Sequence, residues 1–277
     1  MHAMLAALAY AGLAFATTSD ELSSERCAST TAELPLAGKL ALVFGGTSGI
    51  GLATSHLLAK EGARVVAISR NPYVHASRNP QVTDYANIQL AKCDVLDRDS
   101  VSKLIAQHAP IDILISAATG GTRAMGPFLS MDMDGYASSF DKLWGYANVV
   151  RFGAEHLAND GNIVLVSGAP ARKAKKGQVA LASVGAAVEQ LARSVASEIA
   201  PKRINVVSPG IVETPMFGPS SDERTAQLER ATATNLIDRP GEPEEVASAI
   251  LFVVKNKFVT GTTVDVDGGW LQGPKWQ

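Results

Sequence analysis

A cluster of glycines around residues 45–51 has the composition and spacing that point most directly to chemistry. The apolar run Leu40–Phe44 is followed by Gly45-Gly46-Thr47-Ser48-Gly49-Ile50-Gly51, and then by a stretch with helical periodicity. Glycines in such a turn allow a tight bend, a close approach of the backbone to a ligand and close packing of the helix on the strand. Backbone N–H groups at a helix N-terminus bind phosphate. The segment therefore predicts a site for the diphosphate of a dinucleotide.

A basic residue follows the second apolar run. Arg64–Ile68 is followed by Ser69, Arg70 and Asn71. An acid at this place accepts the ribose hydroxyls of NAD and would repel a 2'-phosphate, whereas a guanidinium binds that phosphate through two N–H groups. Arg70 therefore predicts NADP(H) as the cofactor rather than NAD(H). The alternative is an arginine that only faces solvent.

The elements that must position these residues alternate along the chain. Short apolar runs predict strands at 40–44, 64–68, 111–115, 163–166, 204–207 and 263–266, and helical periodicity predicts helices at about 50–61, 97–108, 135–158, 178–200 and 243–254. Such alternation builds a mostly parallel sheet with helices on both faces, the α/β doubly wound Rossmann fold. We expect one domain of this type over residues 38–277.

Residues 1–37 predict an N-terminal extension. Met4–Ala16 is apolar but too short to span a bilayer, and it ends in Ala14-Phe15-Ala16, the small-x-small form of a signal cleavage site. No Lys or Arg precedes this run, which argues against a signal. The alternatives are a targeting segment and an N-terminal helix, in each case followed by a polar linker over 19–35.

Composition excludes several function classes. The 277 residues carry a net charge of -2, which gives no basic face for a nucleic acid. Cys27 and Cys93 are the only cysteines and the histidines show no ligand spacing, so neither a disulfide framework nor a metal site is predicted. We expect a cytoplasmic protein without a transmembrane segment, acting on a small molecule.

The glycine turn resembles the Thr-Gly-x-x-x-Gly-x-Gly fingerprint of the short-chain dehydrogenases/reductases, with Phe44 in place of the threonine and Gly45, Gly49 and Gly51 as its glycines. The resemblance extends over nearly all of residues 38–277. It implies cofactor contacts at the following positions: Gly45, Thr47, Ser48, Gly49, Ile50, Ser69, Arg70, Asn71, Asp94, Val95, Ser116, Ala117, Ala118, Pro209, Gly210, Val212 and Thr214. It also implies a homodimer or homotetramer that pairs through the two long helices.

The family's catalytic residues are replaced in this alignment. Family members carry a tyrosine four residues before a lysine on one helix, with a serine and an asparagine on preceding segments. Leu181 stands at the tyrosine position, Gly185 at the lysine, Gly168 at the serine and Lys142 at the asparagine. Because leucine cannot donate a proton, ordinary ketone reduction is disfavoured.

Two functions remain open. The first is a reductase of a substrate that needs no tyrosine: an iminium ion, a cyclic imine or a conjugated double bond. Fungal short-chain-type reductases that also act as Diels-Alderases are similar in lacking the tyrosine-lysine pair. The candidate catalytic residues are then Ser167, Lys142, Asp141 and Arg123, and a basic loop over 172–176 could receive an anionic substrate. The second is a nucleotide-binding scaffold, sensor or assembly subunit without turnover.

Overall fold

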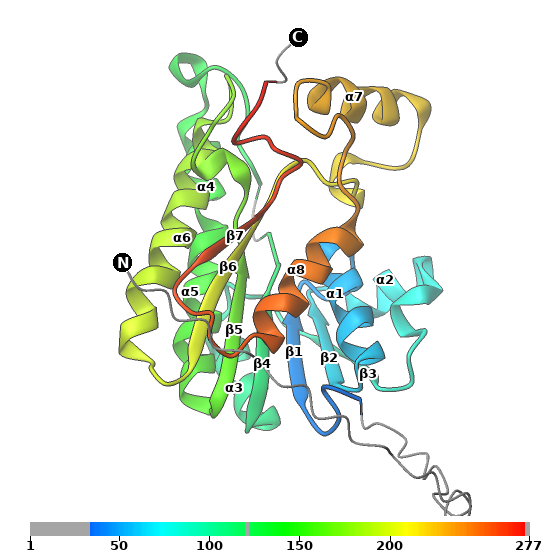
Figure 1. The fold of residues 1–277 in the computed structure, drawn as a ribbon, viewed down its shortest axis with the longest axis vertical. Coiled ribbons are helices and arrows are strands. Elements are labelled where there is room, and N and C mark those ends of the chain that lie inside the picture. The colour runs from blue at the N-terminus through cyan, green and yellow to red at the C-terminus, as the bar shows by residue number, and fades with distance from the viewer. Residues whose placement is uncertain (1–33, 120–121, 275–277) are drawn as a thin grey trace, which may run out of the picture. The chain divides into compact units, whose positions relative to one another are not determined.

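The central element is a seven-stranded parallel sheet. The computed structural model describes residues 34–119 and 122–274, which form one compact unit. Strand order is β3-β2-β1-β4-β5-β6-β7, and every neighbouring pair is parallel (Figure 1). The strands are β1 (Leu40–Phe44), β2 (Arg64–Ser69), β3 (Ile88–Lys92), β4 (Ile111–Ser116), β5 (Leu157–Val166), β6 (Arg203–Pro209) and β7 (Thr263–Val266). The predicted Rossmann fold is confirmed.

Helices cover both faces of this sheet, so its central strands are apolar on both sides. In β1, Leu40, Leu42 and Phe44 face one core, and Ala41 and Val43 face the other. The first core includes residues of α3 (Arg98–His108), α5 (Asp141–His156) and α6 (Val179–Glu198); the second includes residues of α1 (Gly49–Lys60) and α8 (Pro243–Lys255). Both layers are visible in Figure 1.

Three short or peripheral helices complete the described elements. They are α2 (Pro72–Arg78), α4 (Met133–Ser139) and α7 (Asp222–Thr232), and single 3-10 turns include η3 (Ala169–Ala171) and η4 (Pro215–Phe217). In Figure 1, α7 and the last described residues lie beyond the carboxyl ends of the strands. This is the edge of the sheet at which the glycine turn also lies.

The structure differs from the predicted elements in several places. The predicted helix 135–158 is two helices, α4 and α5, which meet at Phe140, and the short helices α2 and α7 were not predicted. Strand β3 was missed because it mixes polar and apolar side chains at the edge of the sheet, where only Ile88 is buried. Residues 1–33 of the predicted extension lie outside the described residues, whereas Leu36, near its end, packs in the second core.

Helix α6 is a core element, although by length and composition alone it could cross a bilayer. It is the one such helix in the described part of the chain. Its side chains Ala180, Val184, Val188 and Ala192 are buried, and its contacts with β6 and α5 place that face against the rest of the fold. The apolar composition of α6 is therefore explained by packing.

Strand order reverses beside β1. The chain passes from β1 outward to β2 and β3, then returns to β4 on the other side of β1. The helices that follow β1 and β4 diverge onto opposite faces, which opens a crevice at the carboxyl ends of these two strands. Ligands of open α/β sheets bind at such a switch point.

Candidate functional site

The glycine turn closes the crevice between β1 and β4. Gly45 has a positive φ of 85°, and a Cβ there would lie 2.7 Å from the Ala118 nitrogen. A Cβ on Gly51 would lie 2.1 Å from the Gly45 carbonyl oxygen. Because both contacts are with backbone, no other residue fits at these two positions without a backbone shift. The turn therefore holds helix α1 directly against β1 and β4.

The N-terminus of α1 is left without a side-chain cap. Ser48 occupies the N-cap, but its hydroxyl accepts no hydrogen bond from the first turn. Uncapped N–H groups and the helix dipole together favour an anion at this end of the 12-residue helix. The described residues therefore fit a bound diphosphate at the predicted place, with Gly49 and Ile50 in the first turn.

The wall beside β2 contains the predicted ribose-side residues. Arg70 and Asn71 are exposed just past the end of β2, and Ser69 Oγ is buried without a hydrogen-bond partner among the described residues. Asp94 accepts a hydrogen bond from the Leu96 amide, which shapes the turn after β3, and Val95 is buried. Arg70 makes no ion pair within residues 34–119 and 122–274, so its charge is available to a ligand.

The opposite wall contains the remaining cofactor candidates. Ser116 ends β4 with a buried hydroxyl that lacks a partner in the described structure, and the Ala117 amide donates to the Phe44 carbonyl. Thr214 is buried against Gly49: a Cβ on Gly49 would lie 3.2 Å from Thr214 Cγ2. The structure thus brings the glycine turn together with the segment Pro209, Gly210, Val212 and Thr214 that follows β6.

Among the cationic side chains of the site, Lys142 has the pKa that is lowered most. Its Nζ donates to the Ser167 carbonyl oxygen at 3.1 Å and lies 5.5 Å from the centre of the Tyr146 ring. Burial and the nearby Arg123 charge lower the pKa of Lys142 to about 8. An amine with such a pKa can give up its proton near neutral pH and regain it from water.

Ser167 is committed to a buried carboxylate. Its Oγ donates to Glu189 Oε1 at 3.1 Å, and Glu189 is only 2% exposed. Arg172 and Arg193 lie 3.5 and 3.7 Å from the other Glu189 oxygen. Arg172 also binds Asp265 on β7. The network ties the end of β5 to α6 and β7, which gives Ser167 a positioning role in the structure.

The two positions that the sequence alignment assigns to the family's tyrosine and lysine lie on one face of α6. Leu181 and Gly185 are four residues apart on this helix. A Cβ on Gly185 would lie 2.9 Å from Ala171 Cβ, so η3 occupies the space that a side chain at 185 would need. Gly168 differs, because a Cβ there would have no neighbour closer than 3.6 Å.

Two further candidates lie at the junction of α4 and α5. Asp141 begins α5 directly before Lys142. Arg123 lies exposed in the loop after β4, and partial desolvation of its guanidinium lowers its pKa. The structure therefore brings Arg123, Asp141, Lys142 and the carbonyl of Ser167 to one region beyond the ends of β4 and β5.

Sequence reasoning missed two residues of this region. His75 on α2 lies 2.5 Å from Thr47 Oγ1 through its Nδ1. Glu189 orients Ser167 from the middle of α6. The available sequence signal for Glu189 was a charged residue among the apolar residues of its helix. The position of His75 depends on the path of the chain after β2 and has no local signal.

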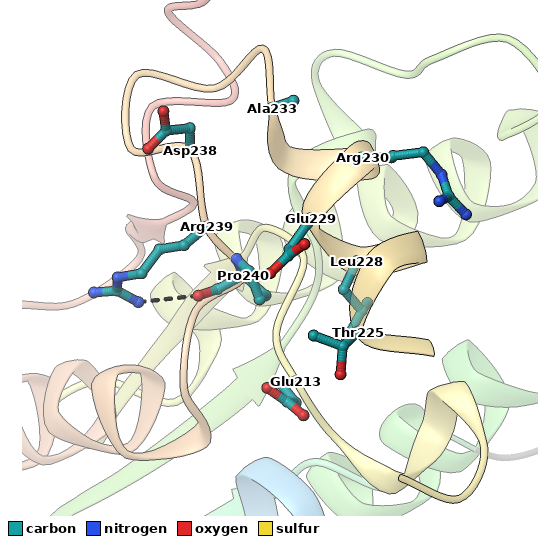
Figure 2. A pocket seen from close by; sticks show the side chains of 9 residues that line it. All are labelled: Glu213, Thr225, Leu228, Glu229, Arg230, Ala233, Asp238, Arg239 and Pro240. Atoms are coloured by element: carbon teal, nitrogen blue, oxygen red, sulfur yellow. Dashed lines mark hydrogen bonds between the residues drawn. The ribbon is translucent and has the colours of Figure 1, made fainter. Parts of the chain in front are cut away.

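A second hollow lies between α7 and the segment that leads to α8. It has a volume of about 560 Å³ and contains Glu213, Thr225, Leu228, Glu229, Arg230, Ala233, Asp238, Arg239 and Pro240. Figure 2 shows Arg230 turned away from the carboxylates of Glu213 and Glu229. Most of its lining residues come from α7 and the segment 233–240 that follows it.

Comparison with known proteins gives consistent matches. Residues 45–271 match the family described as Enoyl-(Acyl carrier protein) reductase. The chain is 33% identical over 248 residues to 3-oxoacyl-(acyl-carrier-protein) reductase FabG of Thermotoga maritima, covering 84% of this chain and 98% of the relative.

Solved structures agree with this result. A small-chain dehydrogenase crystallised in complex with NADPH is 30% identical, with a TM-score of 0.71 over 83% of this chain and 97% of that one. The MalC reductase/Diels-Alderase of Malbranchea aurantiaca is 26% identical, with a TM-score of 0.75 over 85% of this chain and 96% of that one.

Proposed function

The chain belongs to the short-chain dehydrogenase/reductase superfamily, and from that premise we propose that it is an NADP(H)-dependent reductase with a non-standard active site. Its substrate is an iminium ion or a conjugated C=C or C=N bond rather than a simple ketone. The observation that carries the proposal is Lys142, a half-buried side chain whose amine donates to the Ser167 carbonyl and has a pKa of about 8, in a site whose aligned tyrosine and lysine positions hold leucine and glycine.

The residues present fit the cofactor. The uncapped N-terminus of α1 and the Gly45 turn would hold the diphosphate, and Arg70 would pair with the 2'-phosphate. The buried hydroxyls of Ser69 and Ser116 supply unused hydrogen-bonding groups at the ends of the two flanking strands. The complex of a 30% identical relative with NADPH supports the same assignment.

The chemistry divides between cofactor and protein. When bound, NADPH supplies a hydride. For a conjugated C=C or a neutral imine, the atom at the other end of the reduced bond needs a proton, and the Lys142 ammonium holds one. The amine left on Lys142 takes a proton back from water. An iminium substrate needs no proton, because hydride addition gives a neutral amine directly.

Two features of α6 support the proposal that the family's usual ketone chemistry is not used. Leu181 has no acidic group, and Ala171 fills the space beside Gly185. Lys142 instead reaches the site from α5, held by the Ser167 carbonyl at the end of β5. The Ser167–Glu189 bond keeps that carbonyl in place. The resemblance to a reductase that is also a Diels-Alderase is compatible with such a site.

The test is transfer of a labelled hydride. The protein is incubated with 4-deuterated NADPH and a panel of cyclic enones and cyclic imines, and the products are analysed by mass spectrometry and NMR. Incorporation of one deuterium at a single face of the product supports the reductase. NADPH binding without deuterium in any product of the panel would contradict it and favour a nucleotide-binding scaffold.

A further inference from the structure

One side-chain contact joins helix α2 to the glycine turn. His75 Nδ1 lies 2.5 Å from Thr47 Oγ1. Thr47 is only 3% exposed, and His75, in the middle of α2, is half-buried. The Thr47 hydroxyl makes no other hydrogen bond to the described residues. The histidine ring is therefore fixed against the segment that is predicted to hold the cofactor phosphates.

The chain from the end of β2 into α2 is tied to the glycine turn at two points. At the first point, the Gly45 amide donates to the Ile68 carbonyl at 2.8 Å. At the second point, His75 contacts Thr47. Arg70 lies between the two ties, two residues after Ile68 and five before His75. Arg70 and His75 therefore flank the same region at the carboxyl ends of β1 and β2.

The second nitrogen of the His75 ring has no partner in the described part of the chain. Nε2 forms neither a hydrogen bond nor an ion pair there. When the Thr47 hydroxyl donates its proton to Nδ1, the ring proton is on Nε2, and in an imidazolium both ring nitrogens carry protons. In both of these forms, Nε2 is a hydrogen-bond donor without an acceptor.

The chain around this donor has a positive charge. Between residues 34 and 83, the only acidic residue is Glu61. Glu61 pairs with Lys255 at 2.9 Å and follows the C-terminal end of α1, so it lies at the other end of that helix from the glycine turn. Arg70 and Arg78 stand on either side of His75 in the sequence. An anionic ligand therefore suits the free nitrogen.

We propose that His75 is a second ligand of the 2'-phosphate of NADP(H) and determines cofactor preference together with Arg70. The inference rests on the proposed NADP(H)-dependent function and deepens it. Thr47 orients the ring so that Nε2 donates to one phosphate oxygen, while the Arg70 guanidinium binds other oxygens of the same group. Because both residues act on one phosphate, neither alone keeps the preference. NAD(H) carries a neutral hydroxyl at this place and forms no charge-assisted bond with either residue.

The test uses two nucleotides that differ only in this phosphate. Adenosine 2',5'-bisphosphate and adenosine 5'-monophosphate are titrated by calorimetry into the wild type, His75→Phe and Thr47→Val, after thermal melting has shown that each variant is folded. His108→Phe is the matched control, because His108 is also a half-buried histidine on a helix, at the end of α3. We expect the bisphosphate to bind about tenfold more tightly, or better, in the wild type and in His108→Phe.

The variants distinguish a phosphate ligand from a purely structural contact. Loss of most of the preference in His75→Phe at an unchanged affinity for the monophosphate, with a smaller loss in Thr47→Val, supports the inference. An equal fall in affinity for both nucleotides in His75→Phe would overturn it. A wild type without any preference refutes the NADP(H) assignment as well, whereas a wild-type preference that survives in His75→Phe refutes only this inference. Neither nucleotide carries a nicotinamide, so the result does not depend on hydride transfer.

Discussion

Gly185 on α6 and Ala171 in η3 approach so closely that a methyl group on Gly185 would lie 2.9 Å from the Ala171 Cβ. The family's lysine cannot occupy this position while η3 keeps its place. In the proposed alignment, the position predicted for the lysine is therefore one at which η3 leaves little room for a side chain.

This packing predicts that restoring the two side chains does not restore the family's chemistry. We expect Leu181→Tyr/Gly185→Lys to melt several degrees below the wild type and to reduce simple ketones no faster, because the new lysine displaces η3. Gly168→Ser is the matched control at the third altered position, and it should fold normally since the space there is open. Ketone reduction by the double variant at an unchanged melting temperature would refute the packing argument.

Lys142 predicts the pH dependence of turnover. The pKa of about 8 means that the protonated acid dominates below pH 8 and is lost above it. For a conjugated C=C substrate, kcat/KM should be level below pH 8 and fall about tenfold per pH unit above it. The positive charge of Arg123, which is not on α5, lowers the pKa of Lys142. Two other titratable residues near Lys142, Tyr146 and Asp141, lie on α5 with it. If kcat/KM instead rose as the pH increased through 8, the Lys142 ammonium could not be the acid.

Substitution of Lys142 separates proton donation from charge. Lys142→Met should lower kcat on a conjugated substrate by about 10²-fold or more, the usual contribution of a general acid. Lys142→Arg keeps a cation that does not deprotonate near neutral pH, so it should also lose kcat. NADPH affinity, measured by calorimetry, should stay unchanged in both. Wild-type kcat in Lys142→Arg would show that charge alone suffices.

The glycine turn provides a matched pair of substitutions. Gly45 and Gly38 both have positive φ values, 85° and 75°, but only a Cβ on Gly45 meets backbone, at Ala118. Each alanine variant should lose about 1–2 kcal/mol to the left-handed conformation. Only Gly45→Ala should also lose the rise in melting temperature that NADPH produces in the wild type. An equal ligand-induced rise in both variants would argue against the cradle.

The local signals in the sequence were sufficient for the fold, because apolar runs buried on both faces identify the central strands. The glycine cluster between a strand and a helix predicts a phosphate cradle, and the close backbone contacts of the turn are compatible with that prediction. Both depend on residues within a few positions of one another. The edge strand β3 escaped because one buried residue in five is too weak a pattern.

The substrate side depends on contacts between distant segments. Whether Ser167 faces a ligand or Glu189, 22 residues later, is decided by how α6 packs on β5. The position of the loop that carries Arg123 depends on three hydrogen bonds that hold it between α4 and the start of α6. The hydrophobic periodicity of the sequence does not indicate contacts between distant segments. The sequence therefore predicted these residues as separate candidates and did not identify their partners.

The central claim is that this fold holds a phosphorylated dinucleotide, and calorimetric titration with NADPH and NADH tests it most directly. The account predicts that NADPH binds at least tenfold more tightly than NADH, and that Arg70→Gln removes this difference while leaving NADH affinity unchanged. Absence of measurable binding of NADPH at millimolar concentration, or equal affinities for both dinucleotides in the wild type, would contradict it.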